Sequence, residues 1–181
     1  MEVLRLHDDA ALYYLTFSVV QWLPVFVNQE PCLIIVDSLN FCHREKGLRI
    51  AAYVIMPTHV HLIVSDQDFN VERLRQTLLE MRKYTGHQLS DYCQQHLPAA
   101  FGQVLCSTPR TDRARQFWQQ SRHPEAIKTL GFFQSKVDYL HDNPCRKGLV
   151  RDPMHWRFSS AAYWLLDPPG ESDVVLTAVE W

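Results

Sequence analysis

The spacing of apolar and polar positions predicts strands and helices in alternation over the first half of the chain. Residues Leu12 to Trp22 are dominated by Tyr, Leu, Thr, Phe and Val, a composition typical of a strand. Residues Pro31 to Arg44 place apolar side chains close to a helical period, and Gly47 follows where a helix commonly ends on a left-handed glycine. We therefore expect a strand, a turn and a helix.

Two β-branched runs come next. Arg49 to Met56 and His59 to Ser65 are separated only by Pro57 and Thr58, so we expect antiparallel neighbours joined by a tight connection. Residues Val71 to Tyr84 then return to helical spacing. The pattern to this point predicts the order β-α-β-β-α.

The second half of the chain is less regular. Thr85 to Arg115 is rich in Gln, Ser, Pro and Gly and is expected to be irregular with short helical pieces. A short strand near Gln116 to Gln119 would complete the sheet, and a helix from about Pro124 to Asp142 would end at Asn143-Pro144. The predicted fold class is α+β: a ferredoxin-like, RRM-like antiparallel sheet with helices on one face and a tyrosine-bearing helix near the C-terminal part.

Composition indicates one globular domain. The chain has 181 residues, 46% hydrophobic and 21% charged, enough for one ordinary core. We expect a single domain over 1–181, with 166–181 as a peripheral tail. The longest weakly polar stretch, Leu12 to Val27, is too short for a membrane span, and the five cysteines form no Cys-x-x-Cys pair. A cytoplasmic protein without membrane contact or a disulfide framework is expected.

Charge is unevenly placed along the chain. The net charge is −2, but residues 71–157 carry 14 Lys and Arg against 8 Asp and Glu, and the remainder carries 4 against 12. This asymmetry permits a basic face for phosphates inside a mildly acidic protein. Scattered, solvated charge explains the counts equally well.

Two histidines stand out in the second of the paired strands. His59 and His61 are two residues apart, so their side chains share one face of the strand and both imidazoles can converge on one divalent ion. Val60, Leu62 and Val64 should then face the core. As a bare pattern His-x-His is weak, and two half-exposed strand histidines are the alternative interpretation.

The segment around this pair is more specific. Residues 53–64, with the sequence YVIMPTHVHLIV, closely resemble the HUH segment of the single-tyrosine transposases, including the REP-associated tyrosine transposases. The resemblance implies that His59 and His61 bind the catalytic metal, and Thr58 stands where the family often has Asn. A metallo-β-lactamase-like zinc site would need further Asp and His directly downstream, where this chain has Leu62, Ile63 and Val64.

A second segment carries the other half of the resemblance. Residues 136–150, KVDYLHDNPCRKGLV, look like the tyrosine-bearing helix of that family, and Tyr139 matches its nucleophile. On a helix, Lys136, Tyr139 and Asn143 share a face away from the main apolar stripe. That stripe should face the core and consists of Phe133, Val137 and Leu140. Without the resemblance, which spans about residues 12–165, a tyrosine beside such a stripe would be interpreted as a packing residue.

Asn143 has two interpretations. It lies one turn after Tyr139, so its amide oxygen could reach the same ion, and the resemblance implies that it is the third ligand. An Asn before Pro is also a common helix end, and this alternative stays open. His141 should point away from Asn143, and we expect it to be a surface or capping residue.

These residues together imply phosphodiester chemistry. A phenol is protonated at neutral pH, so its attack on a phosphodiester needs a polarised phosphate or a proton acceptor, and a divalent ion supplies the first. The resemblance implies a covalent 5′-phosphotyrosine on Tyr139, a free 3′-OH and Mg²⁺ or Mn²⁺ as cofactor. The ligand set itself leans toward manganese or another transition ion.

The expected partner is single-stranded DNA, hairpin-forming or repeat-derived, bound by a monomer or a homodimer. Phe117 or Trp118 could offer a base-stacking surface, with core aromatics and solvated arginines as the alternative. We expect Trp156, Phe158 and the neighbouring Tyr163 and Trp164 to cover the core. The candidates for phosphate contacts are Arg73, Arg82, Arg110, Arg113, Arg115 and Arg122.

The leading functional hypothesis is therefore an HUH transposase-like DNA nuclease and strand transferase. One alternative is a domesticated protein that keeps the fold and binds single-stranded nucleic acid with little cleavage. Another is an RNA-binding module, for which the usual aromatic-rich strand signature is not evident.

Overall fold

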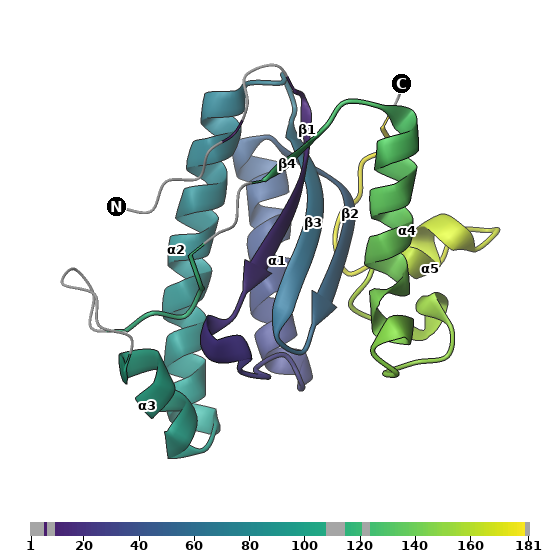
Figure 1. Cartoon of the computed structure of the whole chain (residues 1–181). Helices are drawn as coiled ribbons and strands as arrows, with labels where there is room; N and C mark the ends of the chain where they lie inside the picture. Colours follow the sequence, from purple (N-terminus) through teal and green to yellow (C-terminus); the bar gives the residue numbers. More distant parts are fainter. Residues whose placement is uncertain (1–5, 7–9, 108–114, 121–123, 180–181) are drawn as a thin grey trace.

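The computed structural model describes residues 6, 10–107, 115–120 and 124–179 (Figure 1). The main elements are β1 (Leu12–Ser18), α1 (Gln29–Lys46), β2 (Leu48–Met56), β3 (His59–Asp66), α2 (Val71–His96), α3 (Ala99–Ser107), β4 (Glu125–Ile127), α4 (Leu130–Arg146) and α5 (Ala161–Leu165). Two short 3₁₀ turns, η1 (Val20–Trp22) and η2 (Pro153–His155), follow β1 and α4. The predicted α+β class is confirmed.

The strands form one antiparallel sheet in the order β2-β3-β1-β4. With the order of elements along the chain, this is the ferredoxin-like β-α-β-β-α-β arrangement that the sequence predicts. The pairing of β1 with β3 sets Thr16 opposite His61 and Ser18 opposite His59. The histidine pair therefore lies on β3, one of the two central strands of the sheet.

Helices cover both faces of this sheet. In Figure 1, α1 and α2 lie on one side of it and α4 on the other. The alternation along β3 explains this arrangement, because Val60, Leu62 and Val64 belong to the larger core on the side of α1 and α2, as predicted. Ile63, of opposite orientation, belongs to a smaller cluster that includes Leu140 of α4. The two histidines share the α4 side.

The predicted irregular region after Tyr84 is wrong over residues 85–96, whereas the short helical piece expected within it is present as α3. Helix α2 continues to His96, because Leu89 and Cys93 extend its buried stripe while the Gln and Ser residues that suggested a loop lie largely on its other sides. Helix α3 then follows. Residues 108–114 lie outside the described part of the chain.

The predicted fourth strand is also misplaced. Within the predicted strand, Trp118 makes an isolated bridge to Val19, whereas the strand that completes the sheet is β4, which pairs with Leu12–Tyr14 of β1. The predicted helix therefore begins later, at Leu130, where the Thr129 side chain accepts a hydrogen bond from the Phe132 backbone N–H.

The predicted helix end at Asn143-Pro144 is wrong as well. Helix α4 continues through Pro144 to Arg146, and its end is closed by hydrogen bonds from Lys147 N–H to the Asn143 carbonyl and from Leu149 N–H to the Pro144 carbonyl. A proline inside a helix removes one backbone donor and crowds the preceding turn. Packing of this turn against the sheet, where Asn143 and Pro144 are both buried, offsets that cost.

The segment after α4 packs against β2. The indole N–H of Trp156 donates to the Ile55 carbonyl at 2.9 Å, and that of Trp164 donates to the Ala51 carbonyl at 2.9 Å. Phe158 packs against the larger core, and Tyr163 lies edge-on to Trp164. The prediction that these aromatic residues cover the core is confirmed. Further along, Val174 is buried and Thr177 N–H bonds to the Ile50 carbonyl.

All five cysteines are free, and Cys32, Cys42 and Cys93 are buried as small core residues. Among the described helices, none combines the length and the apolar character that crossing a membrane would need.

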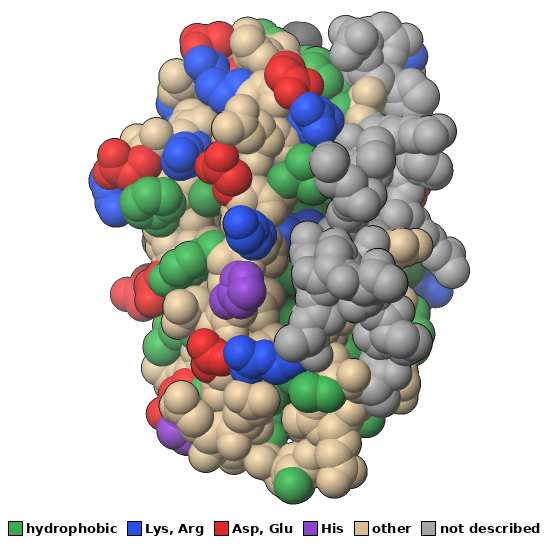
Figure 2. Space-filling model, turned by 90° about the vertical axis from the view of Figure 1, so that its left-hand side faces the viewer, with side chains coloured by type: hydrophobic (Ala, Val, Ile, Leu, Met, Phe, Trp, Pro, Cys, Tyr) green, Lys and Arg blue, Asp and Glu red, His purple; other side chains and the backbone are tan. Residues whose placement is uncertain are grey.

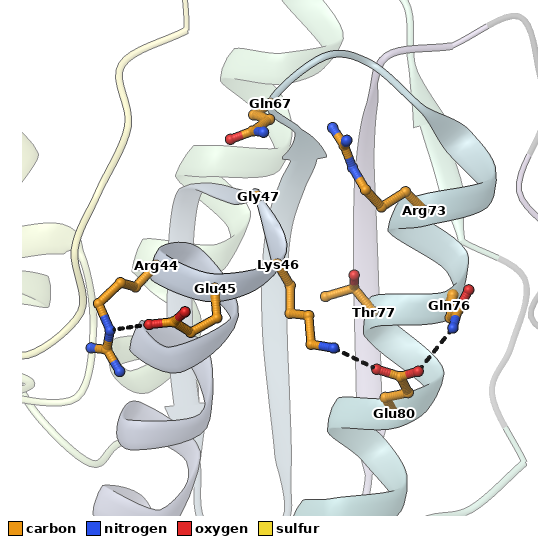
Figure 3. Close-up of a pocket in the computed structure, with 9 residues that line it drawn as sticks. All are labelled: Arg44, Glu45, Lys46, Gly47, Gln67, Arg73, Gln76, Thr77 and Glu80. Atoms are coloured by element: carbon orange, nitrogen blue, oxygen red, sulfur yellow. Dashed lines mark hydrogen bonds and ion pairs between the residues drawn. The ribbon is translucent and has the colours of Figure 1, made fainter.

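Gly47 ends α1, as the sequence predicts. Its φ of +70° is left-handed, and its carbonyl accepts a hydrogen bond from Gln67 N–H at 2.8 Å. Figure 3 shows the pocket beside it, where Lys46 of α1 reaches Glu80 of α2 at 3.3 Å. This pocket lies at the Asp66 end of β3, opposite the end that carries His59.

Replacing Gly47 should destabilise the fold. A Cβ there would lie 2.9 Å from the Gln67 side chain and would have to adopt the left-handed conformation, so Gly47→Ala should lower the free energy of unfolding by about 1–2 kcal/mol. Gly131→Ala is the matched control, because a Cβ there meets nothing within 4 Å, and it should leave stability unchanged or raise it by up to about 1 kcal/mol. Urea unfolding measures both, and equal effects would contradict the role of Gly47.

Candidate active site

His59 and His61 form the centre of the site, on the face of β3 toward α4. They are 9% and 5% exposed, and their ring centroids lie 4.6 Å apart. The shared face predicted from their spacing is therefore present, and the alternative of two half-exposed histidines does not hold. Both rings are buried between the sheet and α4.

Hydroxyl groups hold the Nδ1 atom of each ring. The Thr58 hydroxyl lies 2.9 Å from His59 Nδ1, while the Tyr14 and Thr16 hydroxyls lie 2.7 Å and 2.9 Å from His61 Nδ1. Tyr14 and Thr16 are two residues apart on β1, so both side chains lie on the face of the sheet toward α4. Sequence reasoning missed both, although a threonine within an apolar strand directly opposite a histidine was a usable signal.

Asn143 of α4 reaches the other side of His61. Its amide nitrogen lies 3.0 Å from His61 Nε2, and the side chain is 4% exposed. Because an amide N–H donates, Nε2 must be the acceptor, and the proton of the neutral ring then lies on Nδ1, toward Tyr14 and Thr16. This tautomer directs an Nε2 lone pair toward α4.

Both imidazoles are held in the neutral form. Burial, with a smaller contribution from Lys147, lowers the pKa of His59 to about 4. Burial, followed by the neighbouring His59 and Lys136, lowers the pKa of His61 to about 3. At neutral pH the two rings therefore have the lone pairs that metal coordination requires.

Tyr139 lies beside the histidines but is open to solvent. It is 41% exposed, and its ring centroid is 5.8 Å from that of His61 and 6.4 Å from that of Tyr14. The predicted faces of the helix are confirmed, because Leu140 is buried in the smaller cluster while Tyr139 and Asn143 both face the histidine pair. The site therefore has a buried nitrogen-rich part and an accessible phenol.

His141 is buried, so its prediction as a surface or capping residue is wrong. Its Nε2 lies 2.8 Å from the Ser160 hydroxyl, which accepts a hydrogen bond from Tyr53 N–H at 3.0 Å. Burial lowers the pKa of His141 to about 4. Because α4 packs against both the sheet and the segment before α5, a side chain that points away from Asn143 still meets protein. This contact ties the tyrosine helix to β2.

Three cations on α4 and at its end surround the site. Lys136 Nζ lies 4.5 Å from the Tyr14 ring centroid and 2.8 Å from the Glu125 carboxylate, and the Arg146 guanidinium lies 5.1 Å from the Tyr139 ring centroid. Lys147 follows and acts on His59 through its charge. None of these cations was among the predicted phosphate contacts. Their positions in the sequence, three residues before and seven and eight residues after Tyr139, could have indicated that they lie near its hydroxyl.

The predicted arginines lie elsewhere. Arg110, Arg113 and Arg122 are outside the described residues. Arg115 pairs with Asp91 at 2.9 Å, and Arg73 pairs with Asp66 at 2.6 Å. Arg73 belongs to α2, and Arg115 pairs with a residue of the same helix. Both arginines therefore lie on the face of the sheet opposite the histidines. Figure 2 views the molecule over α2, where Lys and Arg are interspersed with Asp and Glu on the described surface.

Three other predicted contacts are part of the core. Arg82 is 3% exposed, donates to the Gln119 carbonyl at 2.7 Å and lies over the Phe17 ring, so it has no surface for a phosphate. Phe117 and Trp118 are 3% and 6% exposed. Their predicted role as a base-stacking surface is wrong, because both pack against Phe26 beneath the sheet.

The donor set of the candidate site is restricted. Within the described residues, no group of three or more His, Cys, Asp and Glu side chains lies close enough to hold a metal ion. The available ligands are therefore two imidazoles and the Asn143 amide. Two imidazole nitrogens and one amide oxygen form a ligand set that suits a divalent transition ion.

Comparison with known proteins identifies the fold. The chain is similar to the solved structure of a REP-associated tyrosine transposase bound to a REP hairpin, with a TM-score of 0.65 and 17% identity over 100% of this chain and 95% of that chain. A structure assigned as a transposase from Deinococcus radiodurans R1 matches at a TM-score of 0.47 and 15% identity, over 79% of this chain and 97% of that one. No protein-family model and no curated protein matches the sequence.

The ion pair of Arg73 should matter for stability. Burial opposes ionisation of Asp66, but hydrogen bonds from Arg73 and from backbone N–H groups outweigh it and hold the pKa of Asp66 below its ordinary value. Arg73→Gln should therefore lower the free energy of unfolding by about 1–3 kcal/mol at pH 7. A lowered carboxyl pKa stabilises the fold above that pKa, so the difference should shrink as pH falls below about 4 and Asp66 takes up a proton.

Arg75→Gln is the control on the same helix. Arg75 pairs with the exposed Glu72, and its loss should change stability by less than about 0.5 kcal/mol. Urea unfolding between pH 3 and 7 measures both variants. A stable Arg73→Gln variant with weakened DNA binding would instead support the original expectation of a phosphate contact.

Proposed function

We propose that this chain is a metal-dependent single-stranded DNA endonuclease and strand transferase that acts through a covalent 5′-phosphotyrosine on Tyr139. The observation that carries the proposal is the convergence of His59 and His61 from β3 with Asn143 and Tyr139 from α4. The similarity in fold to a tyrosine transposase supports it. Because the proposed enzyme would also join the cleaved DNA to another strand, its activity would be that of a transposase.

His59, His61 and Asn143 would hold Mg²⁺ or Mn²⁺. The two rings are neutral at working pH, and their Nδ1 atoms are already engaged by hydroxyls, which leaves the Nε2 atoms as the ligating nitrogens. Rotation of the Asn143 side-chain amide by half a turn would direct its oxygen, in place of its nitrogen, toward the ion. When bound, the ion would polarise the scissile phosphate and stabilise charge on the leaving oxygen.

The Tyr139 hydroxyl would be the nucleophile. Its oxygen would form a bond to phosphorus while the bond from phosphorus to the 3′ oxygen breaks, and the phenolic proton would pass to solvent as the departing 3′ oxygen gains one. The products are a 5′-phosphotyrosine and a free 3′-OH. The exchange conserves the number of phosphoester bonds, so attack by another 3′-OH can reverse it without ATP.

Cations on α4 would place the DNA. Arg146 lies against the Tyr139 ring, Lys136 stands over Tyr14, and Lys147 lies close enough to His59 to lower its pKa. These positive charges would attract the phosphates of a strand that approaches the hydroxyl. We expect DNA with a hairpin next to the cleaved single strand, because the similar solved protein is bound to a REP hairpin.

Removing the nucleophile should abolish the adduct. Tyr139→Phe keeps the ring packing but lacks the attacking oxygen, so formation of a covalent protein-DNA product should fall by at least about 100-fold. Incubation with labelled hairpin DNA carrying single-stranded flanks, in the presence of Mn²⁺, followed by denaturing gel electrophoresis, measures it. Tyr84→Phe, at an exposed tyrosine of α2, should behave like the wild type.

Two outcomes would redirect the proposal. Equal adduct formation by the wild type and Tyr139→Phe would show that another residue attacks. DNA binding without any adduct in Mn²⁺ or Mg²⁺ would favour the alternative of a domesticated binding protein.

Removing a histidine should remove the metal. His59→Ala should weaken Mn²⁺ binding by more than about tenfold in calorimetry and abolish metal-dependent cleavage while DNA binding is largely kept. His87→Ala, at an exposed histidine of α2, is the control and should bind Mn²⁺ as the wild type does. Chelation with EDTA should stop cleavage by the wild type, and added Mn²⁺ should restore it. Unchanged Mn²⁺ affinity in His59→Ala would contradict the metal site.

A further inference from the structure

Trp22 is an exposed aromatic residue next to the histidine pair. It lies in η1, directly after β1, and is 53% exposed. Its ring lies nearly perpendicular to that of His59, with centroids 5.8 Å apart and planes at 84°. The indole thus contacts the site while much of the side chain is open to solvent.

The backbone holds this ring in an unusual conformation. Gln21 and Trp22 have φ values of 51° and 55°, in the left-handed region that bulky L-residues rarely adopt. Hydrogen bonds fix the turn on both sides, from Val20 N–H to the Phe117 carbonyl at 2.8 Å and from Leu23 N–H to the Val20 carbonyl at 3.2 Å. A large apolar residue is therefore kept at a position where glycine would fit with less strain, which is characteristic of functional sites.

The rings near the site follow one another from Trp22 to Tyr139. Successive centroid distances are 5.8 Å from Trp22 to His59, 4.6 Å to His61 and 5.8 Å to Tyr139. The two residues at the ends are exposed, and the two histidines between them are buried. A single strand with a phosphate at Tyr139 that runs along these rings toward β1 would pass Trp22.

We infer that Trp22 is a nucleobase-binding residue, on which a base of the single-stranded DNA stacks close to the cleaved phosphate. The inference rests on the proposed function and specifies how that site holds its substrate. Lys147 and Arg146 supply positive charge for the phosphates of the same strand, and the indole supplies an aromatic face for a base. Stacking tolerates any base, so Trp22 adds affinity without reading sequence.

The test compares DNA with and without bases. Two fluorescein-labelled strands of about 20 nucleotides, oligo-dT and an abasic strand of the same length, carry the same phosphates, and fluorescence anisotropy gives the affinity for each. The wild type should prefer oligo-dT. Trp22→Gly should reduce that preference by about 5- to 160-fold, the range typical of losing a base stack, while the salt dependence of binding stays the same.

Matched variants separate stacking from folding. Trp22→Gly removes the ring and relieves the left-handed strain, so the variant should unfold at the same or a higher temperature. Trp22→Phe should keep most of the preference for oligo-dT. Phe69→Gly is the control, because Phe69 is also exposed, at 66%, and left-handed, with a φ of 59°, but it follows β3 at the end opposite His59.

The outcomes distinguish this inference from the proposed function. If Tyr139 forms its adduct but Trp22→Gly keeps the wild-type preference for bases, only the role of Trp22 is wrong. Equal weakening toward both strands would also overturn it, since that indicates a loss of charge contacts. A wild-type dimer that becomes monomeric in Trp22→Gly, with unchanged base preference, would assign the indole to a second copy. If the wild type binds neither strand, the role of Trp22 is wrong, whereas the proposed function is judged separately by adduct formation on hairpin DNA.

Discussion

The burial of two imidazoles between the sheet and α4 is the constraint on which the rest of the site depends. A polar ring taken out of water needs hydrogen-bond partners, and an orphaned ring nitrogen costs the fold free energy. Tyr14 and Thr16 meet this need from the sheet, Thr58 from the turn between β2 and β3, and Asn143 from the helix. The contact of Asn143 with His61 therefore fixes where α4 lies, and with it the position of Tyr139.

The same burial prepares the chemistry that we propose. It lowers the pKa of both histidines, which keeps them neutral, and the contacts of His61 favour the tautomer whose Nε2 carries no proton. On the opposite side of α4, the contact of His141 with Ser160 holds the helix to β2. The tyrosine helix is thus anchored on two sides while Tyr139 itself stays exposed.

The two faces of the sheet have different roles. The face covered by α1 and α2 holds the larger core, including Phe117 and Trp118, and its arginines are engaged by neighbouring groups. The face covered by α4 carries the histidines, the tyrosine and three cations. A fold similar to that of a REP-associated tyrosine transposase persists at 17% identity because it needs only the alternation of buried positions, which many sequences satisfy.

Local pattern alone determined much of this protein. Alternation and β-branched runs gave β2 and β3, Gly47 marked the end of α1, and the spacing of His59 and His61 placed both rings on one face, because these features depend on residues close in sequence. The tertiary structure decided what depends on distant partners. Strand β4 is set by its pairing with β1, and α4 passes through Pro144 because the sheet packs against it. The contacts of His141, Arg82 and Trp118 also depend on partners that are distant in the sequence. A side chain's period on its own helix or strand says which way it points, but only the assembled fold says whether protein or solvent lies there.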